Sequence, residues 1–232
     1  MEKVAFTGER YVPGATRKSI EKDHIERYKF CAPKLQGKDV LDIACGVGYG
    51  SHYAIECGAK SYLGVDIDRE AIEHAINNFR GDNVNFIVGD ICNFSLAPMF
   101  NVVLCYETIE HVRCYKDALT NIYNVMRPGG FLYISSPNRT VTSPQCKTLG
   151  CIPNNIYHTQ EFSIEELAGE VCKAGFFVRN IYGQRIRWRI VQYIFSLMGG
   201  KDYLASLVSP KVSTLTKLSI PRYFIVLGEK PL

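Results

Sequence analysis

The chain has 232 residues, of which 47% are hydrophobic and 22% are charged, and its formal net charge is +4. This length fits one large domain, and the apolar fraction is sufficient for a hydrophobic core. The mild positive charge gives no case for nucleic-acid binding by itself. No uncharged apolar stretch reaches the length that crosses a bilayer, and the mixed, charged residues 1–30 do not form a secretion signal.

The nine cysteines form no C-x-x-C pair. Several of them, including Cys45, Cys105 and Cys172, lie in apolar surroundings, where a free cysteine behaves as a small hydrophobe. The pattern therefore favours a reduced, cytoplasmic protein over a disulfide framework.

Strand and helix patterns alternate along the chain. A leading helix is expected over residues 19–31, with Ile20, His24, Ile25 and Tyr28 on one face. Strands are expected over 38–43, 61–66, 84–88, 100–105, 130–135, 176–182 and 222–228. Helices are expected over 50–57, 69–79, 115–126 and 163–173, and Pro128-Gly129-Gly130 predicts a turn before the fifth strand. This alternation predicts an α/β fold, in which helices cover both faces of a mostly parallel sheet.

Residues 40–50 hold the most informative motif. An apolar strand contains Asp42 near its end, and Gly46, Gly48 and Gly50 follow before a helix. Glycines tighten such a turn and let a ligand lie against bare backbone. A dinucleotide site would need the spacing G-x-G-x-x-G, which is absent here, and Asp42 would repel a pyrophosphate. The acid suits a cationic ligand that carries an ammonium and a sulfonium group, namely S-adenosylmethionine.

Two further acids follow the next two predicted strands. Asp66 ends the strand 61–66, about 20 residues after the glycine turn, where a carboxylate can accept hydrogen bonds from ribose hydroxyls. Asp90 follows the strand 84–88 and can accept a hydrogen bond from an adenine amino group, while Ile91 can cover the ring. Each acid alone is more simply a helix cap or a turn residue. Three of them in this order, each at a strand end, favour a cofactor site.

These motifs, over about residues 38–135, resemble the class I S-adenosylmethionine-dependent methyltransferases. The resemblance implies a Rossmann-like sheet of seven mostly parallel strands, the last one antiparallel, in a single methyltransferase domain over residues 1–232. It also implies that the methionine part of the cofactor lies near Asp42 and the glycines, the ribose near Asp66, and the adenine near Asp90. The expected cofactor-binding residues are Asp42, Ala44, Gly46, Gly48, Asp66, Ile67, Asp90, Ile91, Tyr106, Arg10 and Tyr28.

The N-terminal segment 1–34 is expected to cap the cofactor. Its stretch 6–14 and the sequence His24-Ile25-Glu26-Arg27-Tyr28 resemble a bacterial subgroup whose members often act on sugars, glycans or related small metabolites. Arg10 could pair with a carboxylate or phosphate, and Tyr11 or Tyr28 could reach the methionine end. The alternative is a surface strap in which Arg10 is solvated and the tyrosines pack.

The residues after the fourth strand are candidates for the chemistry. Methyl transfer is an in-line displacement that needs a positioned nucleophile and, for a hydroxyl, help with deprotonation. Glu107-x-x-Glu110-His111 resembles the metal-binding stretch of some small-RNA 2′-O-methyltransferases and of ubiquinone-pathway O-methyltransferases, in which a later histidine follows; His158 is the matching candidate here.

Glu107, Glu110, His111 and His158 would suit Mg²⁺ or Mn²⁺, which could lower the pKa of a substrate hydroxyl. Two alternatives remain for the same residues. The stretch could be a structural turn, or His111 or His158 could act as a general base without metal, with Glu107 beside it.

Two segments outside the strand ends are expected to shape the acceptor pocket. The loop 136–160 has few structural signals, and long loops at this edge often carry function. Residues 184–220 read as a helical insertion, in which a helix over 185–198 would place Ile186, Ile190, Tyr193, Ile194 and Leu197 on one face. Its end carries Arg185, Arg187 and Arg189 around Trp188. It could serve as a lid, a phosphate grip, a dimer face, a contact with an anionic membrane surface, or plain packing.

The sequence after strand four is neither Asn/Asp-Pro-Pro-Tyr nor Pro-Cys, so methylation of nucleobases is disfavoured. We predict an enzyme that methylates a hydroxyl of a sugar, a glycan or a related polar small molecule. The alternatives are an N-methyltransferase acting on a small amine or amino sugar, and a non-catalytic module that keeps the cofactor fold. The three strand-end acids argue against the non-catalytic module. Action on an RNA 3′ end would need a basic groove, for which a charge of +4 gives little support.

Overall fold

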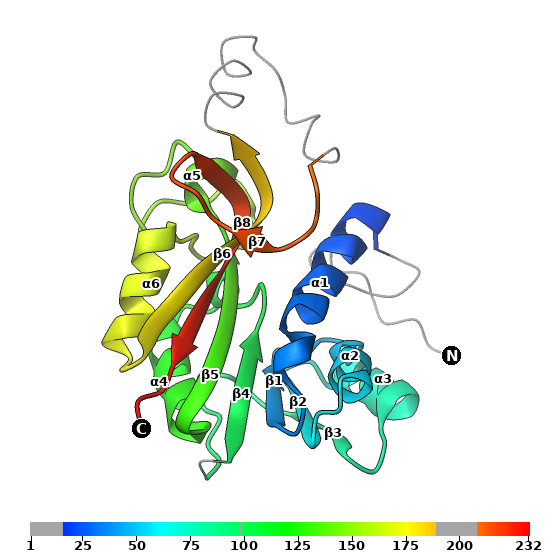
Figure 1. Cartoon of the computed structure of the whole chain (residues 1–232). Helices are drawn as coiled ribbons and strands as arrows, with labels where there is room; N and C mark the ends of the chain where they lie inside the picture. Colours follow the sequence, from blue (N-terminus) through cyan, green and yellow to red (C-terminus); the bar gives the residue numbers. More distant parts are fainter. Residues whose placement is uncertain (1–15, 98, 189–207) are drawn as a thin grey trace.

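A computed structural model describes residues 16–97, 99–188 and 208–232 of the chain. One mixed sheet runs through the molecule and helices cover both of its faces (Figure 1). The strands are β1 (Asp39–Ile43), β2 (Ser61–Asp66), β3 (Val84–Val88), β4 (Phe100–Cys105), β5 (Met126–Pro137), β6 (Phe177–Trp188), β7 (Ser213–Thr214) and β8 (Ser219–Glu229). The helices are α1 (Lys18–Cys31), α2 (Gly50–Glu56), α3 (Arg69–Phe79), α4 (Tyr115–Val125), α5 (Arg139–Thr142) and α6 (Ile164–Lys173), with short 3₁₀ turns η1 (Ala32–Lys34) and η2 (Ile109–His111).

The strand order is β3-β2-β1-β4-β5-β8-β6-β7. The first five strands pair in parallel, whereas β8 pairs antiparallel with both β5 and β6. This confirms the Rossmann-like α/β fold and its antiparallel last strand, and the two-residue β7 makes eight strands instead of seven. The chain order reverses at β1, which lies between β2 and β4. Ligands of such sheets bind at this reversal, outside the carboxyl ends of the strands.

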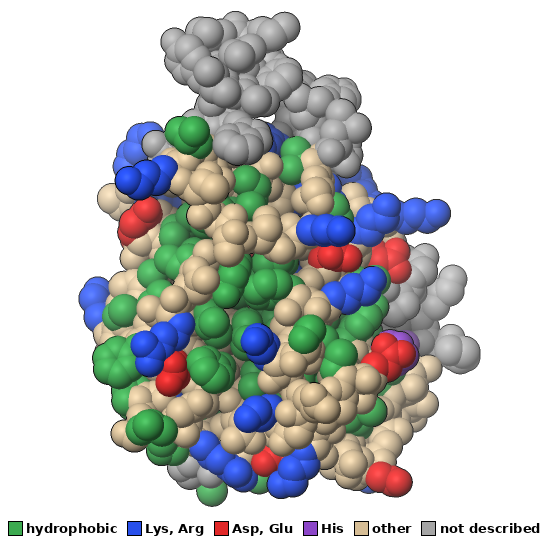
Figure 2. Space-filling model, viewed as in Figure 1, with side chains coloured by type: hydrophobic (Ala, Val, Ile, Leu, Met, Phe, Trp, Pro, Cys, Tyr) green, Lys and Arg blue, Asp and Glu red, His purple; other side chains and the backbone are tan. Residues whose placement is uncertain are grey.

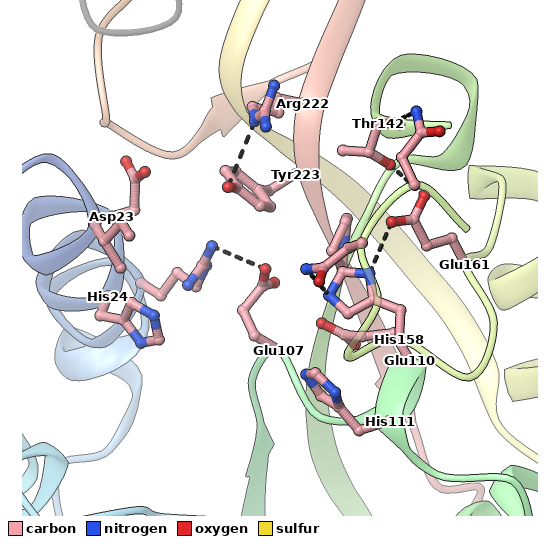
Figure 3. A pocket seen from close by; sticks show the side chains of 15 residues that line it. Asp23, His24, Glu107, Glu110, His111, Thr142, His158, Glu161, Arg222 and Tyr223 are labelled. Atoms are coloured by element: carbon pink, nitrogen blue, oxygen red, sulfur yellow. Dashed lines mark hydrogen bonds and ion pairs between the residues drawn. The ribbon is translucent and has the colours of Figure 1, made fainter. Parts of the chain in front are cut away.

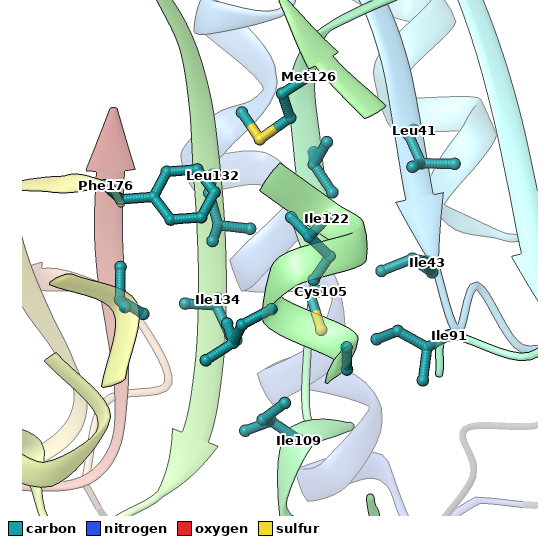
Figure 4. Packing of buried hydrophobic residues seen from close by; sticks show 14 of the residues in the cluster. Leu41, Ile43, Ile91, Cys105, Ile109, Ile122, Met126, Leu132, Ile134 and Phe176 are labelled. Atoms are coloured by element: carbon teal, nitrogen blue, oxygen red, sulfur yellow. The ribbon is translucent and has the colours of Figure 1, made fainter. Parts of the chain in front are cut away.

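The core consists of two apolar clusters, one on each face of the sheet. Side chains of a strand alternate between the faces, so Leu41 and Ile43 of β1 enter one cluster while Val40 enters the other. Figure 4 shows the first cluster, in which Ile122 of α4 packs among residues of β1, β4 and β5. Each fully buried side chain of this size contributes about 1.5–3 kcal/mol. The two clusters hold the strand ends in a fixed arrangement.

Local capping explains why two helices begin where the sequence predicts. The Asp68 carboxylate accepts hydrogen bonds from the backbone N–H groups of Glu70 (2.8 Å) and Ala71 (3.3 Å) at the start of α3. Ser163 and Glu166 form a reciprocal capping box at the start of α6. Such caps satisfy backbone donors that a helix leaves open at its first turn.

The predicted turn at Pro128-Gly129-Gly130 lies inside β5 instead of before it. The pairing with β4 shifts there, because Phe100 faces Met126 while Val102 faces Phe131. Gly129 has a positive φ of 73°, which glycine adopts without strain. The three residues therefore form a bulge within a longer strand. The irregular backbone that they predict is present, but the strand does not begin after them.

The helix expected over 185–198 is wrong for its described part. Residues 185–188 continue β6, and Ile186 and Arg187 face Pro221 and Ile220 of β8. Residues 189–198 of that helix, with Arg189, and the N-terminal Arg10 and Tyr11 lie outside the described residues. The alternation of apolar and basic residues at 185–188 suits a strand with one covered face as well as a helix, and pairing with β8 decides between them.

The buried face of helix α1 shares only Tyr28 with the predicted face. Its buried residues are Asp23, Arg27, Tyr28 and Cys31, while Ile20 and Ile25 remain partly exposed. Two of the four buried residues are charged, so apolar spacing alone could not find this face. The polar partners of these side chains belong to the site described below.

Four of the nine cysteines form disulfides, Cys92–Cys114 and Cys146–Cys151. The expectation of reduced cysteines is therefore wrong for these four, because the fold brings each pair to a Cα–Cα distance of 6.2 Å and 5.3 Å. The other five are free, and Cys31, Cys45 and Cys105 among them are buried. No helix in the described part of the chain combines the length and the apolar character that a bilayer crossing requires.

Candidate functional site

Two cavities meet at the carboxyl ends of the central strands. The β2–β3 cavity has a volume of about 470 Å³ and is lined by the ends of β1, β2 and β3 and by residues 107–114. The α1–β8 cavity has a volume of about 390 Å³ and is lined by α1, by residues 107–111, by parts of residues 137–161 and by the start of β8. Glu107 and His111 line both cavities. A group that passes from one cavity to the other would pass beside these two side chains.

Five predicted cofactor residues line the β2–β3 cavity: Ala44, Asp66, Ile67, Asp90 and Ile91. The carboxylate of Asp66 is buried and accepts hydrogen bonds from the backbone N–H of Gly46 (2.8 Å) and of Asp68 (2.9 Å). It thereby joins the glycine turn to the start of α3. The side chain of Ile67 is 69% exposed, although it is large and apolar. The structure thus brings together the residues predicted for the ribose and adenine.

The glycine turn is compact for a reason that the sequence did not reveal. Gly48 has a φ of 83°, and a Cβ atom there would lie 2.6 Å from Cβ of Ala75 in α3. Ala44, before the turn, also has a positive φ of 64°. The missing side chain at position 48 therefore allows close packing of α3 against the turn.

Asp42 lies in the buried contact between β1 and α1. Its Oδ2 atom accepts hydrogen bonds from the hydroxyl groups of Tyr28 (2.7 Å) and Tyr62 (2.5 Å), while its Oδ1 atom has no hydrogen-bond partner among the described residues. Burial raises the pKa of the Asp42 carboxyl to about 7. Asp42, Gly46, Gly48, Tyr28 and Tyr106 are not among the residues that line the two cavities. Tyr106 instead packs edge-to-face against Tyr28.

Glu107 lies at the junction of the cavities with a positive φ of 49°. Its Oε1 atom accepts a hydrogen bond from Ser135 Oγ (2.7 Å), and its backbone N–H donates to the same Oγ (3.0 Å). Its Oε2 atom lies 3.3 Å from Nη2 of Arg27, whose side chain is 2% exposed. A left-handed conformation is unusual for a glutamate and marks a position that its surroundings hold firmly.

The α1–β8 cavity contains a group of three possible metal ligands. One ligand atom each of Glu110, His111 and His158 lies within 4.8 Å of the others (Figure 3). Glu107, the fourth predicted ligand, is not in this group, because it is held toward Arg27 and Ser135. Burial, with the charge of Glu107 nearby, raises the pKa of the Glu110 carboxyl well above its usual range.

His158 is held by a carboxylate that the sequence analysis did not select. Its Nδ1 atom lies 2.7 Å from Glu161 Oε1, and the two side chains are 5% and 1% exposed. The second Glu161 oxygen accepts a hydrogen bond from the Thr142 hydroxyl (2.5 Å). The bond to His158 and the hydroxyl contacts lower the pKa of the Glu161 carboxyl. With Nδ1–H donating to the carboxylate, Nε2 is left as the acceptor of the Asn155 amide at 2.9 Å.

Three residues on the opposite side of this cavity were not expected from the sequence: Arg27, Arg222 and Tyr223. Arg27 is part of the quoted His24–Tyr28 stretch, but its burial was not evident. Arg222 and Tyr223 belong to β8. They reach this cavity only because of the register in which β8 pairs with β5. Arg185, a candidate phosphate grip, donates instead from Nε to Asp23 Oδ1 at 2.8 Å and is buried.

The sheet is doubly wound, and its strand-end acids surround a cavity at the point where the strand order reverses. These features define a Rossmann-like protein that binds a nucleoside cofactor. The family model described as "Methyltransferase domain" matches residues 34–199. The chain is 31% identical over 180 residues to a "Probable S-adenosylmethionine-dependent methyltransferase" of Mycolicibacterium smegmatis. The aligned segment covers 77% of this chain and 67% of that protein. The chain is 25% identical over 230 residues to a ubiquinone biosynthesis O-methyltransferase of Xylella fastidiosa, covering 92% of each.

Among solved structures, the N-methyltransferase NodS from Bradyrhizobium japonicum, in complex with S-adenosyl-l-homocysteine, superposes with a TM-score of 0.62. It is 15% identical, and the match covers 94% of this chain and 90% of NodS, so it shows a shared fold. The chain spans 61% to 67% of the length of the mycobacterial relatives that it matches. The chain belongs to the family of S-adenosylmethionine-dependent methyltransferases. It is therefore an enzyme whose cofactor is S-adenosylmethionine.

Proposed function

We propose that this enzyme transfers the methyl group of S-adenosylmethionine to a hydroxyl of a sugar, a glycan or a related polar small molecule. The observation that carries the proposal is the junction of the two cavities at Glu107 and His111. In the proposal, the β2–β3 cavity holds the nucleoside of the cofactor, and the α1–β8 cavity holds the acceptor. The second cavity is lined mostly by charged and polar side chains, which suits an acceptor with many hydroxyl groups.

The chemistry that we propose is an in-line displacement at the sulfonium methyl carbon. The acceptor oxygen forms the new bond to the methyl carbon while the bond from sulfur to that carbon breaks, and S-adenosylhomocysteine leaves. The enzyme positions the oxygen and removes its proton. His158 is suited to take the proton on Nε2, because Glu161 fixes the Nδ1–H tautomer and would stabilise the charged ring. The acceptor hydroxyl would replace the Asn155 amide, which now donates to Nε2.

A divalent ion is a second way to activate the hydroxyl at the same place. Glu110, His111 and His158 would hold it, and Glu107 would not. The side chains fit such an ion in two respects. Glu110 Oε2 is buried without a hydrogen-bond partner among the described residues, and the bond from His158 to Glu161 is of the kind that orients metal-bound histidines. When bound, the ion would lower the pKa of the acceptor hydroxyl.

The test begins with calorimetric titration of S-adenosylmethionine and S-adenosylhomocysteine into the purified protein. Saturable binding of both justifies a screen of sugars, nucleotide sugars and polyols as acceptors. With an acceptor in hand, we expect His158→Ala to lower kcat by a factor of about 10² to 10⁴ while leaving the affinity for S-adenosylhomocysteine unchanged. Undiminished turnover in this variant would exclude His158 as the base.

Two further measurements separate the alternatives. Chelation with EDTA abolishes turnover if an ion activates the hydroxyl and leaves it unchanged if His158 acts alone. An amine acceptor, as for an N-methyltransferase, would tolerate His158→Ala, and its rate would fall at low pH as the amine becomes protonated. A folded protein that binds neither S-adenosylmethionine nor S-adenosylhomocysteine would contradict the whole proposal.

A further inference from the structure

We propose that the α1–β8 cavity binds an anionic group of the acceptor, a phosphate or a carboxylate, through Arg27 and Arg222, which both lie beside Tyr223. This inference rests on the proposed function, since it names the chemical class of acceptor for the same cavity. The acceptor would be an acidic or phosphorylated polyhydroxyl compound. Its anion would lie at the arginines and its reactive hydroxyl near His158.

The first observation is the arrangement of two guanidinium groups around one ring. Cζ of Arg27 lies 5.0 Å from the centroid of the Tyr223 ring, and Cζ of Arg222 lies 5.7 Å from it. Figure 3 shows Arg222 and Tyr223 entering the cavity from β8, opposite the side chains of residues 142–161. Stacking on an aromatic ring fixes the plane of a guanidinium. Arg222 also donates from Nε to the Tyr223 hydroxyl, at 3.5 Å.

The second observation is the unused hydrogen-bonding capacity of Arg27. Its side chain is almost completely buried, yet Nε and Nη1 have no hydrogen-bond partner among the described residues, and only Nη2 approaches Glu107, at 3.3 Å. Buried donors without partners are rare in folded proteins, because each carries a desolvation penalty. A planar guanidinium with open donors matches the paired oxygens of a carboxylate or phosphate.

The third observation is the balance of charge at this end of the cavity. Asp23 interacts electrostatically with three arginines, Arg27, Arg185 and Arg222. Its ion pair is with Arg185, whose Nε lies 2.8 Å from Asp23 Oδ1. Glu107 is the second carboxylate, at 3.3 Å from Arg27. Among the described residues, Asp23 is thus shared by three guanidinium groups, and two of these, Arg27 and Arg222, line the cavity. The nearby His24 adds no charge, because burial and the charge of Arg27 lower its pKa to about 3.

The opposite end of the cavity has a different character. There, Glu161 Oε1 lies 2.7 Å from Nδ1 of His158, and Nε2 of the same ring accepts a hydrogen bond from the Asn155 amide. The cavity therefore has a cationic end at α1 and β8 and a proton-accepting end at residues 110–158. An acceptor that carries an anion and a hydroxyl would be oriented by this difference before methyl transfer.

The test measures anion binding by the full chain saturated with S-adenosylhomocysteine. Inorganic phosphate and acetate are titrated separately in a calorimeter at constant ionic strength, because screening by salt would otherwise mimic competition. We expect saturable binding of at least one of them. Stronger binding of phosphate would indicate a phosphorylated acceptor, and stronger binding of acetate a carboxylated one.

The variants identify the site of binding. Arg222→Gln should weaken binding of the preferred anion by about tenfold or more, since a charged hydrogen bond is lost. Arg127→Gln is the matched control, because Arg127 pairs with Asp39 at the opposite end of the sheet, and it should leave anion binding unchanged. Arg27→Lys keeps a positive charge beside Glu107 but removes the open Nε and Nη1 donors, so it should act in the same direction as Arg222→Gln. Thermal melting establishes that each variant is folded.

Three results would overturn the inference. The first is an absence of saturable binding of both anions to the folded protein. The second is equal anion binding by the wild type, Arg222→Gln and Arg127→Gln. The third is a tenfold loss of S-adenosylhomocysteine affinity in Arg222→Gln with unchanged affinity for 5′-methylthioadenosine, which lacks the amino-acid group; the arginines would then hold the carboxylate of the cofactor. Failure of the proposed function would instead appear as absent S-adenosylhomocysteine binding in the wild type.

Discussion

The two cavities are built in different ways, although they share Glu107 and His111. The β2–β3 cavity is formed by consecutive strand ends, and its key carboxylate, Asp66, is fixed by backbone N–H groups of neighbouring turns. The α1–β8 cavity joins four distant segments and is held by charged side chains that pair with each other. The β2–β3 cavity, proposed as the cofactor side, is thus set by local backbone geometry, and the α1–β8 cavity, proposed as the acceptor side, is set by long-range pairs of charges.

The largest expected effect concerns these charge pairs. Arg27→Gln leaves Glu107 without its cationic partner in a buried place, and we expect a loss of about 3–5 kcal/mol in the free energy of unfolding. The double variant Arg27→Gln, Glu107→Gln should lose less, because no uncompensated charge remains. Urea denaturation measures both. A loss below about 1 kcal/mol in the single variant would show that this pair behaves as a surface ion pair.

The next effect compares the disulfide that lines the β2–β3 cavity with the one that lines neither cavity. Cys92 and Cys114 both line the β2–β3 cavity and close a loop of 22 residues, so replacing both with serine should cost about 3 kcal/mol of stability. Cys146–Cys151 closes a loop of only 5 residues, and its replacement should cost about 2 kcal/mol. We expect weaker S-adenosylhomocysteine binding in the first double variant alone. Equal affinities in the two variants would show that the bond does not support the cofactor side.

A smaller effect is expected at the cofactor side itself. Asp66→Ala should weaken S-adenosylhomocysteine binding by about 2 kcal/mol, because it removes a charged acceptor from the cavity and releases the Gly46 N–H. Asp68→Ala is the control, since it removes the cap of α3 without changing a lining residue. The control should lose about 1 kcal/mol of stability and retain its affinity. Calorimetric affinity unchanged by Asp66→Ala would show that the ribose site is misplaced.

The last effect is a slope with pH and concerns Asp42, which lines neither cavity. Its folded-state pKa of about 7 is above the usual 3.8, so the unfolded chain releases this proton first. The free energy of unfolding should therefore fall as pH rises from about 4 to about 7, by at most about 1.4 kcal/mol per pH unit. Asp42→Asn should flatten this slope. An unchanged pH profile of urea denaturation in the variant would assign the slope to other groups.

The same contrast explains what the sequence could predict. Asp66, Asp90 and Ile91 follow apolar strand patterns directly, and parallel strands bring their carboxyl ends to one edge. The three residues line one cavity, as residues at one sheet edge can. Strands 61–66, 84–88 and 100–105 also have the predicted bounds, because each is a buried apolar run between clear turns. The roles of these residues in binding stay predictions.

The acceptor side could not be predicted in the same way. Glu161 and Arg222 acquire their positions only from the fold of residues 137–161 and from the pairing of β8 with β5. Arg27 was overlooked because helix amphipathicity looks for apolar faces, whereas the buried face of α1 carries charges. The set Glu107, Glu110, His111 and His158 came from a resemblance to metal-binding motifs. The structure brings the last three together, while the Glu107 side chain contacts Arg27 and Ser135. A metal-binding role stays a prediction.

The contacts of helix α1 indicate where the folding unit of this chain begins. The matched family segment starts at residue 34, after α1 has ended. Yet α1 supplies Tyr28 to Asp42, Arg27 to Glu107 and Asp23 to Arg185, three buried polar contacts with three different strands or strand ends. A fragment trimmed to residues 34–199 would lack α1, so Asp42, Glu107 and Arg185 would lose these partners. Helix α1, which precedes the matched family segment, is thus part of the smallest piece of this chain that can fold with these buried polar groups matched.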